Sequence, residues 1–271
     1  MAIDSSLPLG VFDSGLGGLT VVREIMAALP HERVLYLGDT ARVPYGTRSA
    51  ATVVRYAQAC ARALVGRGVK ALVVACNTVS AVALEVLRAD LDLPVLGVIE
   101  PGARAAVAAS RSLRIGVLAT PGTIASGAYP RAVLSVSTRA DVQAHAAPLL
   151  VPLCEEGWLE GDVPRLSVRR YLEPLARARV DVVVLGCTHY PLLRPIIEHE
   201  AHDMIGPDVQ IVDSAHATAA ELSALLTERN LRAPAAAGDV ELLVTDLPRS
   251  FSEMSARFLG GAPRDVHVID L

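Results

Sequence analysis

The fold class follows from residues 182–191, which read VVVLGCTHYP. A short apolar run bounded by glycine predicts a strand that is buried on both faces of a parallel sheet. The run ends at Cys187, and His189 follows two residues later. Ligands of open α/β sheets bind just beyond the carboxyl ends of the strands. We therefore expect Cys187 to lie at a functional site.

The same pattern occurs earlier in the chain, at residues 71–78, which read ALVVACNT. Here a second apolar run ends at Cys76, and Asn77 and Thr78 follow as natural N-cap residues of the next helix. Free cysteine is often simply buried, so either thiol alone is equally well explained as core. Two thiols at two equivalent strand ends favour an internal duplication that contributes one thiol from each half.

The order of the remaining runs supports this duplication. Apolar runs at 9–12 and 113–119 open the two halves in the same way, and each is followed by a polar turn and a helix. The predicted fold is α/β, with two pseudo-symmetric domains, each a mainly parallel sheet flanked by helices, and an active site in the cleft between them. Residues 1–96 and 207–271 are assigned to the first domain with Cys76, and residues 97–206 to the second with Cys187.

Residues 149–158 fit this scheme less clearly. We predict a strand that runs into a loop. Its paired carboxylates, Glu155 and Glu156, form either a solvated turn or part of a site.

Composition excludes several classes of protein. A chain with 52% hydrophobic and 20% charged residues is typical of a well-cored soluble protein, and no apolar run is long enough to span a membrane. Four cysteines without close pairing, and no basic segment ahead of an apolar run at the start, predict reduced thiols and a cytoplasmic location. A net charge of −4 with scattered arginines argues against a nucleic-acid partner.

No cofactor or metal is expected. The single lysine, Lys70, precedes the 71–75 strand at the end opposite Cys76, where it cannot serve a pyridoxal phosphate site. Residues 198–203 lack the two-histidine spacing of a zinc helix. The turn at 13–18 resembles a dinucleotide fingerprint, but its third glycine falls on Thr20. A carboxylate ligand fits this turn better, with Asp13 orienting a base or an ammonium group.

Two facing thiols are compatible with three chemistries: a redox disulfide, a single cysteine nucleophile, or proton transfer by two bases. Only the last uses both thiols, because one removes a proton from carbon and the other returns one on the opposite face. A free thiol has a pKa near 8.5, so each thiol needs help to ionise. Asp13 and His189 are the candidate bases. Backbone donors of the glycine turn at 15–18 are expected to hold the substrate carboxylate.

The motifs together resemble the glutamate racemases over almost the whole chain. The segments that carry the resemblance are FDSGLGGL (12–19), GDT (38–40) with PYG (44–46), ACNT (75–78), GVIEP (97–101) and LGCTHYP (185–191). The resemblance implies cofactor-independent interconversion of L- and D-glutamate, a supply of D-glutamate for peptidoglycan, and a homodimer.

The resemblance also implies roles for individual residues. Cys76 handles the D-enantiomer with help from Asp13, and Cys187 handles the L-enantiomer with help from His189 and a glutamate. That glutamate is identified with Glu155, although Glu156 stands next to it. The implied substrate contacts are Asp13, Ser14, Pro44, Tyr45, Gly46, Asn77, Thr78, Thr120, Thr188 and His189.

Two alternatives stay open at this point. A racemase of the same scaffold could act on aspartate or another acid, since the side-chain carboxylate pocket has no signature in the sequence. A non-catalytic binding protein with two α/β lobes would also hold an amino acid in its cleft, but it would leave both thiols without a role.

Overall fold

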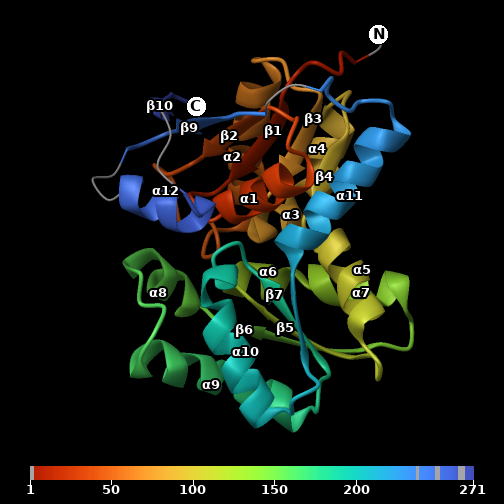
Figure 1. Ribbon diagram of the computed structural model, residues 1–271, viewed down its shortest axis with the longest axis vertical. Helices are drawn as coiled ribbons and strands as arrows, with labels where there is room; N and C mark the ends of the chain where they lie inside the picture. Colours follow the sequence, from red (N-terminus) through yellow and green to blue (C-terminus); the bar gives the residue numbers. More distant parts are fainter. Residues whose placement is uncertain (1–2, 236–237, 248–250, 262–265) are drawn as a thin grey trace.

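Two parallel sheets, each flanked by helices, lie one above the other in the computed structural model, which describes residues 3–235, 238–247, 251–261 and 266–271 (Figure 1). The first sheet has the order β10-β9-β2-β1-β3-β4 and the second the order β6-β5-β7-β8. The strands of the first sheet are β1 (Leu9–Asp13), β2 (Val34–Gly38), β3 (Ala71–Val74), β4 (Val95–Gly97), β9 (Val240–Val244) and β10 (Val266–Val268). Those of the second are β5 (Arg114–Ala119), β6 (Asp141–Ala146), β7 (Val182–Gly186) and β8 (Gln210–Asp213).

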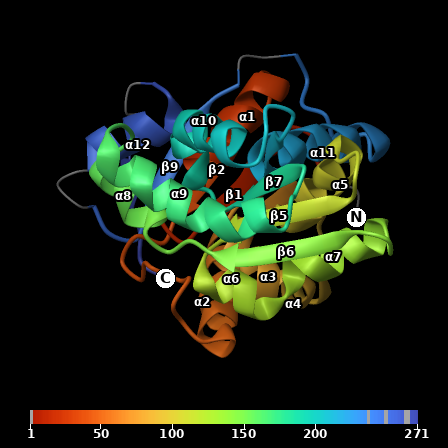
Figure 2. The same cartoon turned by 90° about the horizontal axis from the view of Figure 1, so that it is seen from below.

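Helices cover both sheets, as the view from below shows (Figure 2). They are α1 (Leu19–Ala28), α2 (Ala50–Val65), α3 (Asn77–Val82), α4 (Leu84–Asp90), α5 (Ile99–Ala109), α6 (Pro121–Ser126), α7 (Ala128–Val136), α8 (Leu150–Glu156), α9 (Asp162–Arg177), α10 (Arg194–Met204), α11 (Ser214–Glu228) and α12 (Phe251–Leu259). A 3₁₀ turn, η1 (Tyr190–Leu193), follows β7. Among the described residues no helix is both long and apolar enough to cross a membrane.

The strand order confirms the predicted pseudo-symmetry. The run β2-β1-β3-β4 of the first sheet is repeated as β6-β5-β7-β8 in the second, with every pair parallel. Every residue of β3 and β7 is buried, as their unbroken apolar runs predict. The two thiols therefore follow equivalent strands, Cys76 after β3 and Cys187 after β7.

The strand at 210–213 corrects one predicted boundary. We expected the chain to return to the first domain at 207, but β8 pairs with β7 in the second sheet. The reason is the duplication itself, because β8 occupies the place in the second sheet that β4 occupies in the first. The return comes one element later, with α11, which packs against α1 and α5.

Residues 149–158 also differ from the prediction. They form helix α8 instead of a strand and loop. Pro152 falls in the first turn of this helix, where its missing N–H has no helical partner in any case. The helix ends at Gly157, whose φ of +76° closes it in the left-handed conformation.

The single lysine is buried at the amino end of β3. Lys70 is fully buried, and its Nζ lies 2.5 Å from a carboxylate oxygen of Glu32 and donates to the carbonyl of Ser5 at 2.8 Å. Glu32 also accepts a hydrogen bond from the backbone N–H of Ala233. This pair lies at the amino end of β3, which agrees with the predicted place of Lys70 at the end of the strand opposite Cys76.

Replacing Lys70 with methionine is expected to destabilise the protein by about 3–5 kcal/mol, because Glu32 then remains buried without its cation. Urea unfolding measures this change, and the double variant K70M/E32M should recover most of it. The control is Arg177→Met, which removes an exposed pair with Glu173 and should have no measurable effect. A K70M variant within 1 kcal/mol of wild type, taken as roughly the value of an ordinary surface pair, contradicts the prediction.

Candidate active site

A cavity of about 310 Å3 lies between the two sheets, and both predicted thiols line it. It is built from the carboxyl ends of strands in both halves, where parallel sheets place their ligands. Among the predicted site residues, those that line it are Ser14, Pro44, Tyr45, Gly46, Cys76, Asn77, Thr78, Thr120, Glu155, Cys187, Thr188 and His189. Asp13, which precedes Ser14 in the chain, is buried and is not among the residues that line the cavity.

The first thiol is positioned by the end of β3 and the start of α3. Cys76 is the N-cap of α3, so Asn77 and Thr78 lie in the first turn of that helix instead of capping it as predicted. The Cys76 thiol donates to the Ser14 hydroxyl at 3.6 Å. Asp13 accepts a hydrogen bond from the Gly18 backbone N–H at 2.9 Å through Oδ2, while its Oδ1 has no partner among the described residues.

The second thiol begins a chain of three polar groups. Cys187 Sγ lies 3.8 Å from His189 Nδ1, and His189 Nε2 lies 3.2 Å from Glu155 Oε1. Glu156, the alternative site carboxylate in the sequence, is exposed and borders a different cavity. Of the two neighbouring glutamates it is therefore Glu155 that contacts the histidine.

Burial controls the acidity of both thiols. Burial, followed by the charge of Asp13, raises the pKa of the Cys76 thiol to about 12. Burial also raises the pKa of Cys187 well above its ordinary value, and the charges of Cys76 and Asp13 act in the same direction. In the absence of a ligand, both thiols are protonated at neutral pH.

The raised pKa of Cys76 predicts how fast this thiol reacts with iodoacetamide. Only the thiolate form of a cysteine is alkylated by this reagent. Below a pKa of about 12 the thiolate fraction rises roughly tenfold per pH unit. The alkylation rate of Cys76, followed by mass spectrometry, should therefore keep rising from pH 7 to pH 10. A free cysteine peptide, the control, should level off above its own pKa of about 8.5. A plateau for Cys76 near pH 9 contradicts the prediction.

The glycine turn has a different role from the one we predicted. We expected the backbone donors of residues 15–18 to hold a substrate carboxylate, but none of these four residues lines the cavity. The Gly18 N–H is taken by Asp13, and a side chain at Gly17 would collide with the ring of His189. Glycine is thus required here because the two halves approach each other closely.

Hydrogen bonds between described residues join the two halves around the cavity. Thr20 donates toward the carbonyl of Thr188 at 2.9 Å. Tyr129 donates to Oδ1 of Asn77 at 2.7 Å, and the hydroxyls of Thr78 and Thr120 lie 3.0 Å apart. The residue that broke the dinucleotide fingerprint, Thr20, therefore serves as a contact between domains.

The loop after β2 is held in place by a buried carboxylate. Asp39 is fully buried and accepts a hydrogen bond from the Tyr45 hydroxyl, pairs with Arg42 at 2.7 Å and accepts from Thr245 at 2.8 Å. Tyr45 thus combines the two roles considered from the sequence, since its hydroxyl closes the loop and its side chain also lines the cavity.

Several wall residues have no sequence signature of their own: Val43, Thr47, Pro121, Pro148, Val151 and Pro152. Val151 and Pro152 lie one helical turn before Glu155 and therefore share its face of α8. A helical interpretation of residues 149–158 would have found them.

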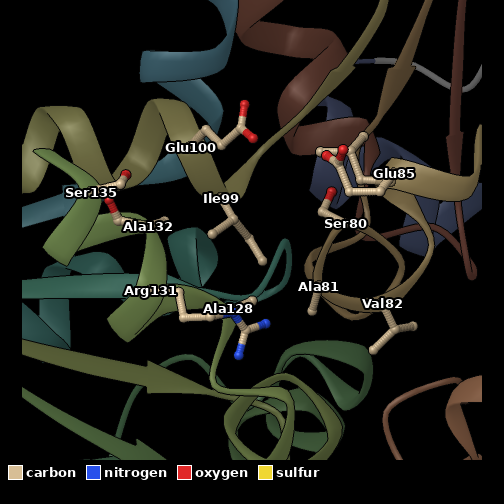
Figure 3. A pocket seen from close by; sticks show the side chains of 11 residues that line it. Ser80, Ala81, Val82, Glu85, Ile99, Glu100, Ala128, Arg131, Ala132 and Ser135 are labelled. Atoms are coloured by element: carbon tan, nitrogen blue, oxygen red, sulfur yellow. Dashed lines mark hydrogen bonds between the residues drawn. The ribbon is translucent and has the colours of Figure 1, made fainter. Parts of the chain in front are cut away.

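A second cavity of about 300 Å3 lies between the end of α3 and helix α7 (Figure 3). Its charged groups already have partners. Glu85 and Glu100 both pair with Arg88, and Arg131 donates to the carbonyl of Ser126. Neither thiols nor histidines are among its lining residues. The groups suited to proton transfer belong to the cavity between the two sheets.

Comparison with known proteins agrees with this site. The sequence model of the Asp/Glu/hydantoin racemase family matches residues 17–222, which include both cysteine motifs. The chain is 50% identical to the glutamate racemase of Geobacter metallireducens over 264 residues, which cover 97% of this chain and 96% of that protein. The chain belongs to the Asp/Glu/hydantoin racemase family. The resemblance seen in the sequence is thereby confirmed.

Solved structures of this racemase family show the same fold. A glutamate racemase isoform from Bacillus anthracis superposes with a TM-score of 0.93 at 39% identity, covering 98% of both chains. The glutamate racemase from Francisella tularensis, solved in complex with D-glutamate, gives a TM-score of 0.91 at 33% identity, again over 98% of both chains. The predicted fold class is confirmed.

Proposed function

We propose that this protein interconverts L- and D-glutamate by proton transfer at the α-carbon between two cysteines. The observation that carries the proposal is the presence of two thiols, from equivalent ends of duplicated strands, in the wall of one cavity. A racemase must treat two mirror-image substrates alike, and a duplicated acid/base pair meets that requirement. The names of the relatives support glutamate as the substrate.

In the proposed mechanism Cys187 removes the α-proton of L-glutamate and Cys76 donates a proton to the opposite face. The two thiols exchange roles when D-glutamate is the substrate. Because burial raises the pKa of both thiols, each needs a neighbouring group to take up its proton. His189 is proposed to do this for Cys187, because its Nδ1 lies 3.8 Å from the thiol and its Nε2 lies 3.2 Å from Glu155. Asp13 is proposed to do it for Cys76.

Two buried polar atoms without a hydrogen-bond partner support the proposal that the ligand is polar and charged. Asn77 lines the cavity, and its Nδ2 is buried without a partner among the described residues. The Asp13 Oδ1 is likewise unpaired. A buried polar atom without a hydrogen bond destabilises the fold unless a ligand supplies the missing partner. We propose that Asn77 donates to a substrate carboxylate and that the unpaired Oδ1 of Asp13 takes up the proton of Cys76.

Solvent deuterium exchange tests the function. Purified protein is incubated with L- or D-glutamate in D2O, without any added cofactor, and the α-hydrogen is followed by NMR alongside optical rotation. Exchange at the α-carbon with loss of optical activity, starting from either enantiomer, is the expected result. Binding of glutamate without exchange would instead favour a binding protein in which the cysteines are structural.

Substrate choice is tested by parallel assays on glutamate and aspartate. We expect faster turnover of glutamate, and a reversed preference would assign the protein to the alternative racemase activity. The supply of D-glutamate for peptidoglycan, a cytoplasmic location and a homodimer belong to the same proposal. Growth of a depleted strain with and without D-glutamate, cell fractionation and light scattering test these three points in turn.

A further inference from the structure

A helix of the first domain reaches the proton-transfer groups of the second. Helix α12, from the last part of the chain, lies beside α8 in both views (Figures 1 and 2). It packs on α1, so it belongs to the half that carries Cys76. Two of its neighbouring residues, Arg257 and Phe258, contact the groups that serve Cys187.

Arg257 caps the carboxyl end of α8. Its Nη1 donates to the carbonyls of Cys154 at 3.1 Å and Glu155 at 2.7 Å. The last carbonyls of a helix have no partner within the helix and carry the negative end of its dipole, so a guanidinium is favourable there. Arg257 fits closely, because a Cβ on Gly157 would lie 2.6 Å from its Nη2. Glycine at the end of α8 leaves the space that the arginine fills.

Glu155, whose backbone carbonyl accepts from Arg257, is also the residue whose side chain contacts His189. Phe258, fully buried, meets the His189 ring edge-on, with ring centroids 5.1 Å apart. Helix α12 thus contacts both Glu155 and His189, and none of its described side chains lines the cavity.

We propose that Arg257 is a positioning residue for the half-reaction at Cys187. By holding the end of α8 it sets the place of Glu155, and through Glu155 the orientation of His189 toward Cys187. The proposal rests on the proposed racemase function. It assigns Arg257 to one of the two proton transfers only, because none of the contacts that Arg257 makes with described residues leads to Cys76.

Isotope effects distinguish this role from a general structural one. Racemisation passes through two transition states in series, one at each cysteine. When L-glutamate carries deuterium at its α-carbon, only the step in which Cys187 removes that deuterium becomes slower. When D-glutamate carries it, only the step in which Cys76 removes the deuterium becomes slower. The isotope effect on kcat/KM for each enantiomer therefore reports how far that cysteine limits the rate.

The variant Arg257→Met should lower kcat/KM about tenfold, as a small misplacement of a catalytic group does. The isotope effect should rise for deuterated L-glutamate and fall toward one for deuterated D-glutamate. Glu253→Gln is the matched control, since it removes the ion pair of Arg257 at 3.2 Å but keeps both carbonyl contacts. It should leave both isotope effects at their wild-type values.

The outcomes separate the two proposals. A wild-type protein that shows no α-hydrogen exchange overturns the proposed function, and this proposal with it. If the wild-type protein racemises glutamate but both isotope effects are unchanged in the variant, only the role of Arg257 is overturned. If Arg257→Met does not fold, Arg257→Lys is measured by the same criterion, because a single ammonium cannot serve both carbonyls and Glu253 as the guanidinium does.

Discussion

Alanine in place of either Cys76 or Cys187 is expected to abolish racemisation in both directions, by at least about 10^3-fold in kcat. Each direction needs one thiol as base and the other as acid, so neither enantiomer can be converted with a single thiol. Any residual α-hydrogen exchange should be confined to one enantiomer, L-glutamate in C76A and D-glutamate in C187A, and should proceed without inversion. NMR in D2O combined with chiral chromatography measures both quantities.

The control for this experiment is Cys60→Ala. Cys60 is buried in α2 and does not line the cavity. Its loss should leave kcat and KM at their wild-type values. Full racemase activity in C76A or C187A would exclude the two-thiol mechanism.

The second large effect is expected from Glu155→Gln, with Glu156→Gln as its matched control. When His189 takes the proton of Cys187 it becomes an imidazolium, and a neutral amide 3.2 Å away stabilises that charge less than a carboxylate does. We expect kcat to fall roughly 10^2-fold in E155Q. The exposed Glu156 makes no contact with the histidine, so E156Q should match wild type.

Both directions of the reaction are to be measured for these variants. The two enantiomers have equal free energies, so kcat/KM must fall by the same factor for L- and D-glutamate. Unequal factors would indicate an impure or unstable preparation. An E155Q variant with wild-type activity, or an E156Q variant as impaired as E155Q, would contradict the assignment of Glu155.

The correct and the incorrect predictions have different physical origins. The runs at 71–74 and 182–186 were predicted correctly because a strand buried on both faces is apolar at every position, a signal that is local in the chain. Residues 149–158 were assigned wrongly because Pro152 is compatible with a helix only at its start, and the start of α8 has no capping side chain to mark it. The boundary at 207 was wrong because strand pairing depends on partners distant in sequence.

The sequence by itself determined the α/β class, the duplication and the identity of the two thiols, because each is encoded in short apolar runs and the residues that end them. Tertiary structure alone decided which of two adjacent glutamates meets His189, since that depends on the rotation of α8. It also decided that the glycine turn packs against His189 instead of lining the cavity, and that Arg257 reaches across from the first domain. These contacts join residues far apart in the chain, and only the packing of the two halves brings them together.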